Sequence, residues 1–470
     1  MANPHEPIHE TWLSSNRIVP HRFIRPVIEF TRVEAAGGIV LLIAAMIAII
    51  WANSAWSNAY FELFNTPIEF SAGIIEIDET LKNLINDGLM VVFFFVVGLE
   101  IKRELVVGEL NSVKKASLPA LAALGGMVVP ALIFIAFVAP IGNPEALRGW
   151  GIPMATDIAF SVGVVALLGS RVSVGAKLFL LALAIVDDIG AIVVIAVFYT
   201  DELHLGYLAF AAVLLLAMHF AKKVGVSSML FYVPVAFAIW YGFLESGVHA
   251  TIAGVVLGLM TPVYAKYSDE QFRQKAVLVL ERWDINRAAR HAVERLDHDA
   301  LELAEVAKAS VPPLNRLERA LHPWSSFVIV PLFALANAGV RFVGTGTGLG
   351  EQLTSPIALG VAVGLMVGKP VGVTAATWLG LKLNLGVLPR RTNMKTIVGL
   401  GALAGIGFTV SLFVTELAFN QVLLADEAKL GIFLGSFVAG VVGFTILRLL
   451  KTPEEGSAET SEPIPESASG

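Results

Sequence analysis

Long apolar runs separated by short polar segments constrain the fold of this chain more than any other feature. A helix needs about 20 mostly apolar residues to cross the hydrocarbon core of a bilayer, and the runs approach or reach that length. Only 15% of the residues are charged, whereas roughly 25% is usual in soluble proteins, so the chain lacks a surface that water would solvate. We therefore predict an all-α polytopic membrane protein with about twelve transmembrane helices. The expected spans are 35–52, 83–101, 117–139, 153–169, 176–199, 205–221, 228–244, 246–262, 324–341, 356–381, 396–419 and 429–450.

The distribution of basic residues predicts how the chain is oriented. Lys and Arg gather in the N-terminal arm, in every second connection and in the long connection 263–322, whereas segment 53–79 has neither. Segments rich in Lys and Arg face the cytoplasm according to the positive-inside rule. Both termini are therefore expected in the cytoplasm, which requires an even number of spans.

Segments outside the spans define the expected domain organisation. The cytoplasmic arm is 1–34 and the membrane domain is 35–450, within which the connection 263–322 has an amphipathic pattern that predicts helix. The Glu-, Ser- and Pro-rich tail 451–470 is expected to be disordered. Residues 67–77 alternate apolar and polar side chains, which predicts a small external β-hairpin.

Residue types and motifs that the sequence lacks exclude several classes of function. The chain has no cysteine, which excludes disulfides, thiol catalysis and Cys-ligated zinc or iron–sulfur sites. Nothing in the sequence indicates nucleic-acid binding or a cofactor, and no nucleotide-binding motif is present. The first 30 residues are polar and contain no apolar core, so a cleavable signal peptide is not expected.

Charged side chains within the apolar runs are the candidate functional residues, because such charges usually face a cavity or a partner. Asp187 and Asp188 lie near the middle of LALAIVDDIGAIVVIAV. Adjacent residues of a helix point about 100° apart, so the two carboxylates need not share a partner. An ion pair that only holds helices together would need a single acid, so the two acids favour an ion site.

Two other runs carry polar or charged residues in mid-span. Thr156 and Asp157 follow Gly151 and Pro153, which weaken a helix, so we expect an interrupted span near the aspartate. Helix capping by the same residues is the alternative, and it also implies a broken helix. Lys369 is flanked on each side by at least a dozen apolar or small residues, which favours burial over snorkelling to the interface.

Two sets of three spans, 117–199 and 356–450, have a predicted interruption in the middle span. Asp157 marks the first interruption and Gly405 and Gly407 mark the second, although glycines alone more often permit close helix packing. The first spans of the two sets begin on opposite sides of the membrane, which predicts inverted repeats with two interrupted, crossing helices. Broken helices at matching positions indicate an ion site near the midplane, as is general for secondary transporters built from inverted repeats.

A further group of titratable residues lies toward the ends of the spans, where interface anchors and solvated helix ends have the same composition. Glu100 and Glu104 are one helical turn apart at an expected cytoplasmic end. The whole group is Asp87, Glu100, Glu104, His249, Glu318 and His322.

Nine segments, in order and over nearly the whole membrane region, resemble the NhaA family of sodium/proton antiporters. They are VFFFVVGLEIKREL, ATDIAF, LLGSRV, ALAIVDDIGAI, SGVHATIAGV, LHPW, PLFALANAG, VGKPVG and GIGFTVSLF. Two departures from the family pattern are the length of segment 263–317 and Arg319, which occupies a position where a histidine can occur.

The resemblance implies pH-activated, electrogenic export of Na⁺ or Li⁺ in exchange for external H⁺, for pH and sodium homeostasis. The implied location is among the lipids of a bacterial inner membrane. Asp188, Asp187 and Thr156 are then the expected ligands of the transported Na⁺, and Asp187 is the proton-carrying partner of Lys369. Asp157 would balance the helix ends where the broken spans cross. The group of titratable residues near the span ends matches positions linked to pH activation or a cytoplasmic funnel. The external segment 53–79 is a candidate surface for a homodimer.

The residues themselves are consistent with an antiport mechanism. Sodium is a hard cation that prefers oxygen ligands, and a buried carboxylate can bind either Na⁺ or a proton. Their competition, combined with alternating exposure of the site, is sufficient for antiport.

Other classes of membrane protein fit the residues less well. Prenyl transferases space their acids as DDxxD, and here the fifth position is Ala191; the GxGD-like tetrad of intramembrane aspartyl proteases does not occur. We therefore do not expect an enzyme. A channel or scaffold would not need titratable acids together with an intramembrane lysine.

Overall fold

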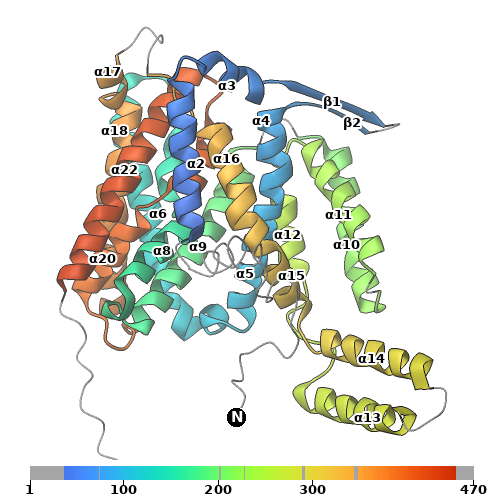
Figure 1. The fold of residues 1–470 in the computed structure, drawn as a ribbon. Coiled ribbons are helices and arrows are strands. Elements are labelled where there is room, and N and C mark those ends of the chain that lie inside the picture. Colours follow the sequence, from blue (N-terminus) through green and yellow to red (C-terminus); the bar gives the residue numbers. More distant parts are fainter. Residues whose placement is uncertain are drawn as a thin grey trace, which may run out of the picture.

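The computed structural model describes residues 36–72, 75–200, 203–226, 228–287, 292–342 and 348–450. The expected N-terminal arm and C-terminal tail lie outside the described residues. The described chain forms a helical bundle with a β-hairpin at one end and a pair of helices projecting from the other (Figure 1). We name these the β end and the α13 end.

Eight helices within the described residues are long and apolar enough to cross a membrane. This confirms the all-α polytopic membrane fold. The eight are α4, η3 and α5 (Leu81–Asn83, Leu84–Leu89, Met90–Val106); α6 and η5 (Val113–Val138, Ala139–Ile141); α7, η6, α8 and η7 (Pro144–Leu147, Arg148–Met154, Ile158–Leu168, Gly169–Arg171); α9 (Val174–Phe198); α10 (Leu205–Lys223); α15, η8 and α16 (Pro313–Trp324, Ser325–Ile329, Val330–Asn337); α18, η9 and α19 (Pro356–Val363, Gly364–Gly368, Lys369–Lys382); and α22 (Val422–Leu449).

The remaining predicted spans coincide with bent or shorter helices. One bent pair is α2 (Ala36–Ala52) with α3 (Ser57–Phe64), at 117°, and the other is α20 (Met394–Ala404) with α21 (Phe408–Ala418), at 47°. Two shorter apolar helices are α11 (Met229–Leu244) and α12 (Thr251–Met260). The total of twelve spans stays a prediction, because length and hydropathy identify at most ten in the described chain.

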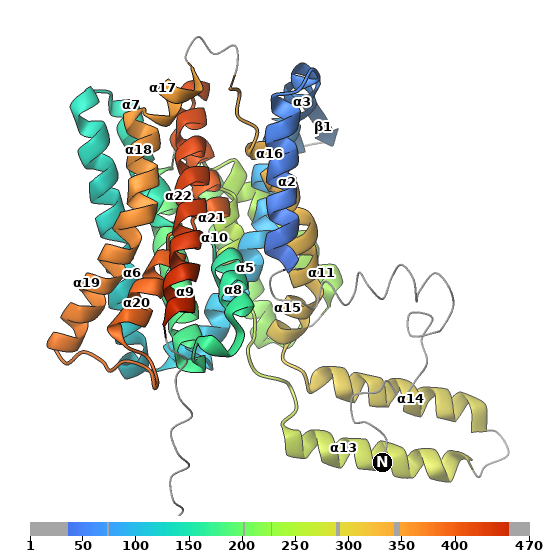
Figure 2. The same ribbon diagram turned by 60° about the vertical axis from the view of Figure 1, so that its left-hand side comes forward.

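The helices pack as two groups that lie side by side (Figures 1 and 2). The first, which we call the core group, comprises α6 to α9 and α18 to α22; α6 packs along α19, and α22 packs against α18 and α20. The second, the scaffold group, comprises α2, α4, α5, α12, α15 and α16; α5 packs against α12, and α16 against α2. Helices α10 and α11 pack together beside the scaffold group.

The core group contains the two sets of three spans in opposite orientation. Helix α18 starts near the β end and α19 finishes at the α13 end (Figure 2). Helix α6 follows α5 at the α13 end and runs toward the β end. In each set the middle span is interrupted, at 155–157 in the first and at 405–407 in the second.

Two hairpins lie outside the bundle. Strands β1 (Pro67–Ala72) and β2 (Ile75–Thr80) are antiparallel, with Pro67 opposite Thr80, which confirms the predicted β-hairpin. Segment 263–322 contains α13 (Asp269–Arg287), α14 (Ala292–Ala309) and the first part of α15. Helices α13 and α14 project from the bundle in both views (Figures 1 and 2), and their cytoplasmic location stays a prediction.

A buried apolar cluster joins the two groups of helices. It includes Phe94 and Phe333 from the scaffold group and Phe134 and Phe413 from the core group. The ring of Phe413 lies 5.2 Å from that of Phe94 and 6.1 Å from that of Phe333. Aromatic side chains therefore fill the boundary between the two groups around Phe413.

Candidate ion-binding site

The two interrupted spans meet at their interruptions. The Thr156 hydroxyl donates a hydrogen bond to the Ala404 carbonyl (2.8 Å), and the Asp157 N–H donates to the Ile406 carbonyl (2.6 Å). A helix that stops inside a bilayer leaves its terminal backbone groups without partners. Each broken span here supplies partners for the other, which explains how both interruptions can be buried.

Asp157 caps the second halves of both broken spans. Its Oδ1 accepts from the Phe160 N–H at the start of α8 (3.0 Å). Its Oδ2 accepts from the N–H (3.2 Å) and the hydroxyl (2.6 Å) of Thr409 at the start of α21. Helix N-termini carry partial positive charge, so one buried carboxylate balances two converging helix ends.

Glycines allow the two interruptions to approach so closely. A Cβ at Gly405 would collide with the Leu365 carbonyl, and a Cβ at Gly407 would lie 2.9 Å from the Ala155 carbonyl. Backbone atoms cannot move aside as a flexible side chain would. The glycines of this run therefore permit close packing at the same place where the helix is interrupted.

Lys369 reaches the interruption from the neighbouring span. It follows η9, a π-helical turn, and stands before Pro370 at the start of α19; such turns within helices are frequent at functional sites. Its fully buried ammonium group lies 2.5 Å from Asp187 Oδ2 and donates to the Thr156 hydroxyl at 3.0 Å. Lys369 thus connects the aspartate pair of α9 to the first broken span.

The aspartate pair retains oxygens that no described residue satisfies. Asp187 is completely buried, and its Oδ1 accepts no hydrogen bond from the described residues. Asp188 is 7% exposed and forms no ion pair or hydrogen bond within the described residues. A buried oxygen without a partner is unfavourable unless a ligand or water occupies it. Carboxylate oxygens grouped with a threonine hydroxyl are the donors that a hard cation such as sodium prefers.

Three of the predicted end residues form a cluster near the α13 end. Arg103 contacts both oxygens of Glu318, at 2.5 and 2.7 Å, and lies 3.9 Å from Glu104. Glu104 also accepts a hydrogen bond from the Glu109 N–H. Glu100 lies within electrostatic reach of Arg103 and of both other glutamates. The cluster therefore links α5 to α15.

The other predicted end residues do not join this cluster. Asp87 lies toward the β end, seven residues after β2 ends at Thr80, and its carbonyl accepts from the indole of Trp240. The His249 Nε2 lies 2.5 Å from the Tyr199 carbonyl, just past the end of α9. His322 is exposed. The structure thus divides the six residues between the two ends of the bundle.

The sequence analysis did not identify several polar residues that form buried contacts in and around the core group. Thr409 holds Asp157, and the Ser411 hydroxyl donates to the Ile152 carbonyl at 2.7 Å. Lys82 and Lys429 both pair with Glu416, at 2.5 and 2.8 Å. Glu416 lies inside the apolar run 396–419, so the rule that singled out Asp187 would also have identified it.

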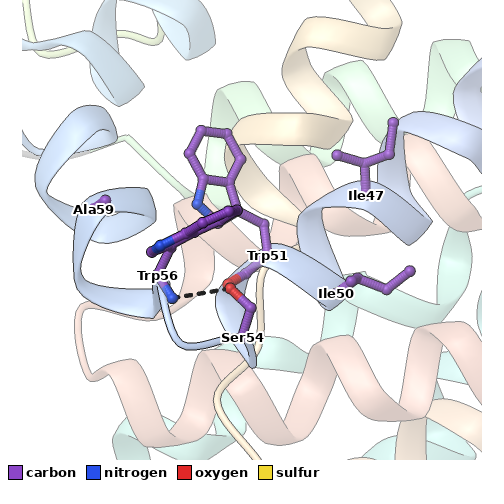
Figure 3. A pocket seen from close by; sticks show the side chains of 6 residues that line it. All are labelled: Ile47, Ile50, Trp51, Ser54, Trp56 and Ala59. Atoms are coloured by element: carbon purple, nitrogen blue, oxygen red, sulfur yellow. Dashed lines mark hydrogen bonds between the residues drawn. The ribbon is translucent and has the colours of Figure 1, made fainter.

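A separate hollow of about 540 Å³ lies at the bend between α2 and α3 (Figure 3). Its walls are almost wholly apolar, and the Ser54 hydroxyl is already occupied as an acceptor from the Trp56 N–H. Such walls offer no ligands for an ion, so this hollow is unrelated to the charged site. Its lining residues are Ile47, Ile50, Trp51, Ser54, Trp56 and Ala59.

Comparisons with known proteins give consistent matches over nearly the whole chain. The family model described as "Na+/H+ antiporter 1" matches residues 28–447. The chain is 44% identical to Na(+)/H(+) antiporter NhaA 2 of Sorangium cellulosum over 445 residues, covering 95% of this chain and 94% of the relative. It is 46% identical to Na(+)/H(+) antiporter NhaA of Anaeromyxobacter sp. over 448 residues, covering 94% of each chain. A third relative, Na(+)/H(+) antiporter NhaA 2 of Syntrophotalea carbinolica, is 45% identical over 427 residues, covering 90% of this chain and 96% of the relative.

Proposed function

This chain belongs to the NhaA family of Na⁺/H⁺ antiporters, and from that premise we propose that it exports Na⁺ or Li⁺ electrogenically in exchange for external protons. The single observation that carries the proposal is the Lys369–Asp187 ion pair next to the unpaired Asp188, where two broken helices meet. We further propose that the α13 end faces the cytoplasm of a bacterial cell, as the distribution of Lys and Arg predicts.

The proposed cation ligands are Asp188, Asp187 and the Thr156 hydroxyl. Sodium entering between them would compete with Lys369 for Asp187, because a carboxylate oxygen cannot serve both cations at close range. Burial strengthens this competition, since charges interact more strongly where water is excluded. Loading of Na⁺ therefore separates the ion pair, and unloading restores it.

Proton coupling follows from the charge balance of the site. When no sodium is bound, Asp188 and Lys369 hold protons, and the Lys369 ammonium group pairs with the Asp187 carboxylate. One incoming Na⁺ brings a single positive charge, whereas two aspartates and a lysine can release more than one proton. The exchange would then move net charge and respond to the membrane potential.

Asp157 has a supporting role in this proposal. Its two oxygens are occupied by α8 and α21, so it is a poorer sodium ligand than Asp188. Its contribution is to keep the two broken spans in register around the site. The charge that it provides offsets the two helix N-termini that converge there.

Regulation is proposed to reside in the cluster of Arg103, Glu104 and Glu318, together with Glu100. These residues connect α5 to α15 at the α13 end, where they would respond to cytoplasmic pH before the buried site does. His322 is exposed on the same helix as Glu318. Asp87 and His249 would act separately, from the β end.

We also propose that segment 53–79 mediates a homodimer. It includes α3, β1 and most of β2, and the hairpin extends sideways from the bundle at the β end (Figure 1). A strand pair that extends beyond its own bundle can pair with the same element of a second copy. The arrangement would leave the ion site of each copy complete.

The proposed exchange is tested in everted membrane vesicles that contain the protein and no other sodium/proton antiporter. Respiration acidifies the vesicle interior, and addition of Na⁺ or Li⁺ should release protons at a rate that rises with pH. A channel would let either gradient dissipate alone, whereas an antiporter couples them. In proteoliposomes, an imposed membrane potential should change the exchange rate, and an unaffected rate would refute electrogenic exchange.

A further inference from the structure

A buried set of opposite charges joins the core group to the scaffold group near the β end. Lys82 is in α4 of the scaffold group, and its Nζ lies 2.5 Å from Glu416 Oε2. Glu416 belongs to α21 of the core group, and its Oε1 lies 2.8 Å from Lys429 in α22 of the same group. The side chains of Lys82, Glu416 and Lys429 are 26%, 14% and 6% exposed.

One face of α21 runs from the ion site to this set of charges. Thr409, which holds Asp157, is followed by Phe413 and Glu416 at intervals of four and three residues. Residues with this spacing share one face of a helix. Seven residues of helix span roughly 10 Å, so α21 is a short rod with the site at one end and Glu416 at the other.

The middle of that face is closed by aromatic rings. Phe413 is completely buried between Phe94 of α5 and Phe333 of α16. A passage from the ion site to the β end along this face is therefore obstructed twice. The first obstruction is the aromatic contact, and the second is the ion pair between Lys82 and Glu416.

We propose that the Lys82–Glu416 ion pair is a latch that closes the ion site toward the β end, and that Lys429 keeps Glu416 paired when the latch opens. This proposal rests on the proposed antiport, because alternating access requires one group of helices to move against the other. The pair joins the two groups, so such a movement stretches or breaks it. The Glu416–Lys429 pair lies within one group, so it moves as a unit.

The second lysine determines how readily the latch can open. A buried charge that loses its only partner is strongly destabilised, and Glu416 is only 14% exposed. Lys429 remains beside Glu416 in either position, so opening does not leave the carboxylate isolated. Lys82 is the most exposed of the three and can be solvated at the β end once it separates. Asp426, one turn before Lys429, is also buried and keeps the local charge balanced.

A crosslinking experiment tests the latch, and the absence of cysteine makes the natural chain a suitable background. The variant Lys82→Cys/Glu416→Cys is treated with a short, reducible bis-methanethiosulfonate reagent, and exchange is measured in proteoliposomes. The matched control is Glu416→Cys/Lys429→Cys, which lacks the same carboxylate but joins two helices of one group. Crosslinking the first pair should reduce exchange to the rate of protein-free liposomes, and reduction should restore it. Crosslinking the control pair should leave the rate unchanged.

The outcomes separate the latch from the proposed function. Exchange that continues in the crosslinked Lys82→Cys/Glu416→Cys protein overturns the latch, as does equal loss in the crosslinked control. Absence of sodium/proton exchange in the unmodified natural chain would instead refute the proposed antiport.

A second measurement does not depend on transport activity. A cysteine at position 413 is buried while the latch is closed, so its reaction with a membrane-impermeant maleimide from the β end reports opening. In the Phe413→Cys background, Lys82→Met should speed labelling roughly fivefold, the ratio that about 1 kcal/mol of ion-pair energy produces. Lys429→Met should slow it, because opening would then isolate Glu416. Equal labelling rates in the three backgrounds overturn the latch, and so does faster labelling in both variants, which would indicate general loosening.

Discussion

Replacing Lys369 by alanine tests whether its ion pair with Asp187 holds the unloaded site together. The ammonium group is fully buried, lies 2.5 Å from Asp187 Oδ2 and donates to Thr156. Its removal leaves the buried Asp187 carboxylate without its cation, and Oδ1 already lacks a hydrogen-bond partner among the described residues. The site would then contain three carboxylates and no compensating lysine.

The expected loss of stability follows from these contacts. Removing one partner of a buried ion pair destabilises a protein by about 3–5 kcal/mol, because the remaining charge is left without compensation. The truncation also removes the methylenes of the lysine, and large-to-small substitutions in a core cost about 2–5 kcal/mol. Lys369→Met keeps most of that volume, so the difference between the two variants isolates the cavity contribution from the charge contribution.

Thermal unfolding in one detergent, followed by loss of the monodisperse peak on size exclusion, measures the effect. Lys369→Ala should melt lowest, Lys369→Met next, and both should lose exchange. The double variant Asp187→Asn/Lys369→Met removes both charges of the pair and should regain stability relative to Lys369→Met, because the carboxylate that lost its partner is removed as well. Single variants that melt at the wild-type temperature would refute the ion pair as a stabilising contact and would favour a snorkelling lysine.

Three further substitutions and one deletion test other parts of the argument. Asp188→Asn should abolish Na⁺- and Li⁺-driven exchange. It should also abolish the Na⁺-induced rise in melting temperature, which for the wild type reflects a stabilisation of about 2.7 kcal/mol at a Na⁺ concentration one hundred times Kd. Near-normal exchange would contradict carboxylate competition. Asp157→Asn should lower stability by about 1–2 kcal/mol through loss of charge at two helix N-termini, measured by thermal unfolding; an unchanged melting temperature would contradict that role. Glu318→Gln should shift the pH profile of exchange and leave the apparent sodium affinity at saturating pH intact, with the exposed Arg319→Gln as control; a profile that superimposes on wild type removes Glu318 from regulation. Deletion of 67–80 should convert the proposed dimer to a monomer, as measured by light scattering, and an unchanged mass would refute the proposed dimer surface.

The sequence predicted the bounds of a span well where the whole helix is apolar. The fifth predicted span, 176–199, corresponds to Val174–Phe198. The ninth was placed at 324–341, but the continuous helix begins at Pro313 and ends at Asn337. Helix α15 carries charged residues such as Arg316 and Glu318, so hydropathy finds the apolar part of a helix and misses its polar extension.

The site was predictable in part because charges inside apolar runs are rare and conspicuous. That rule identified Asp157, Asp187, Asp188 and Lys369. In the structure Lys369 pairs with Asp187 and donates to Thr156, the residue before Asp157. Their partners across the bundle were not predictable. Thr409 lies 252 residues from Asp157, and nothing local to Thr409 distinguishes it from threonines that bond to their own helix.

The residues that sequence reasoning missed connect the site to the latch. Asp157 fixes the start of α21 through Thr409, and α21 carries Phe413 and Glu416 on the same face. A helix of this length is stiff, so a displacement of the broken spans on sodium loading is transmitted to Glu416 and hence to Lys82. The same connection works in reverse, because linkage between two sites is reciprocal. A latch that favours closure must therefore also bias which ion occupies the aspartate pair, and the Lys82→Met variant that opens more readily should show an altered apparent sodium affinity although it lies outside the site.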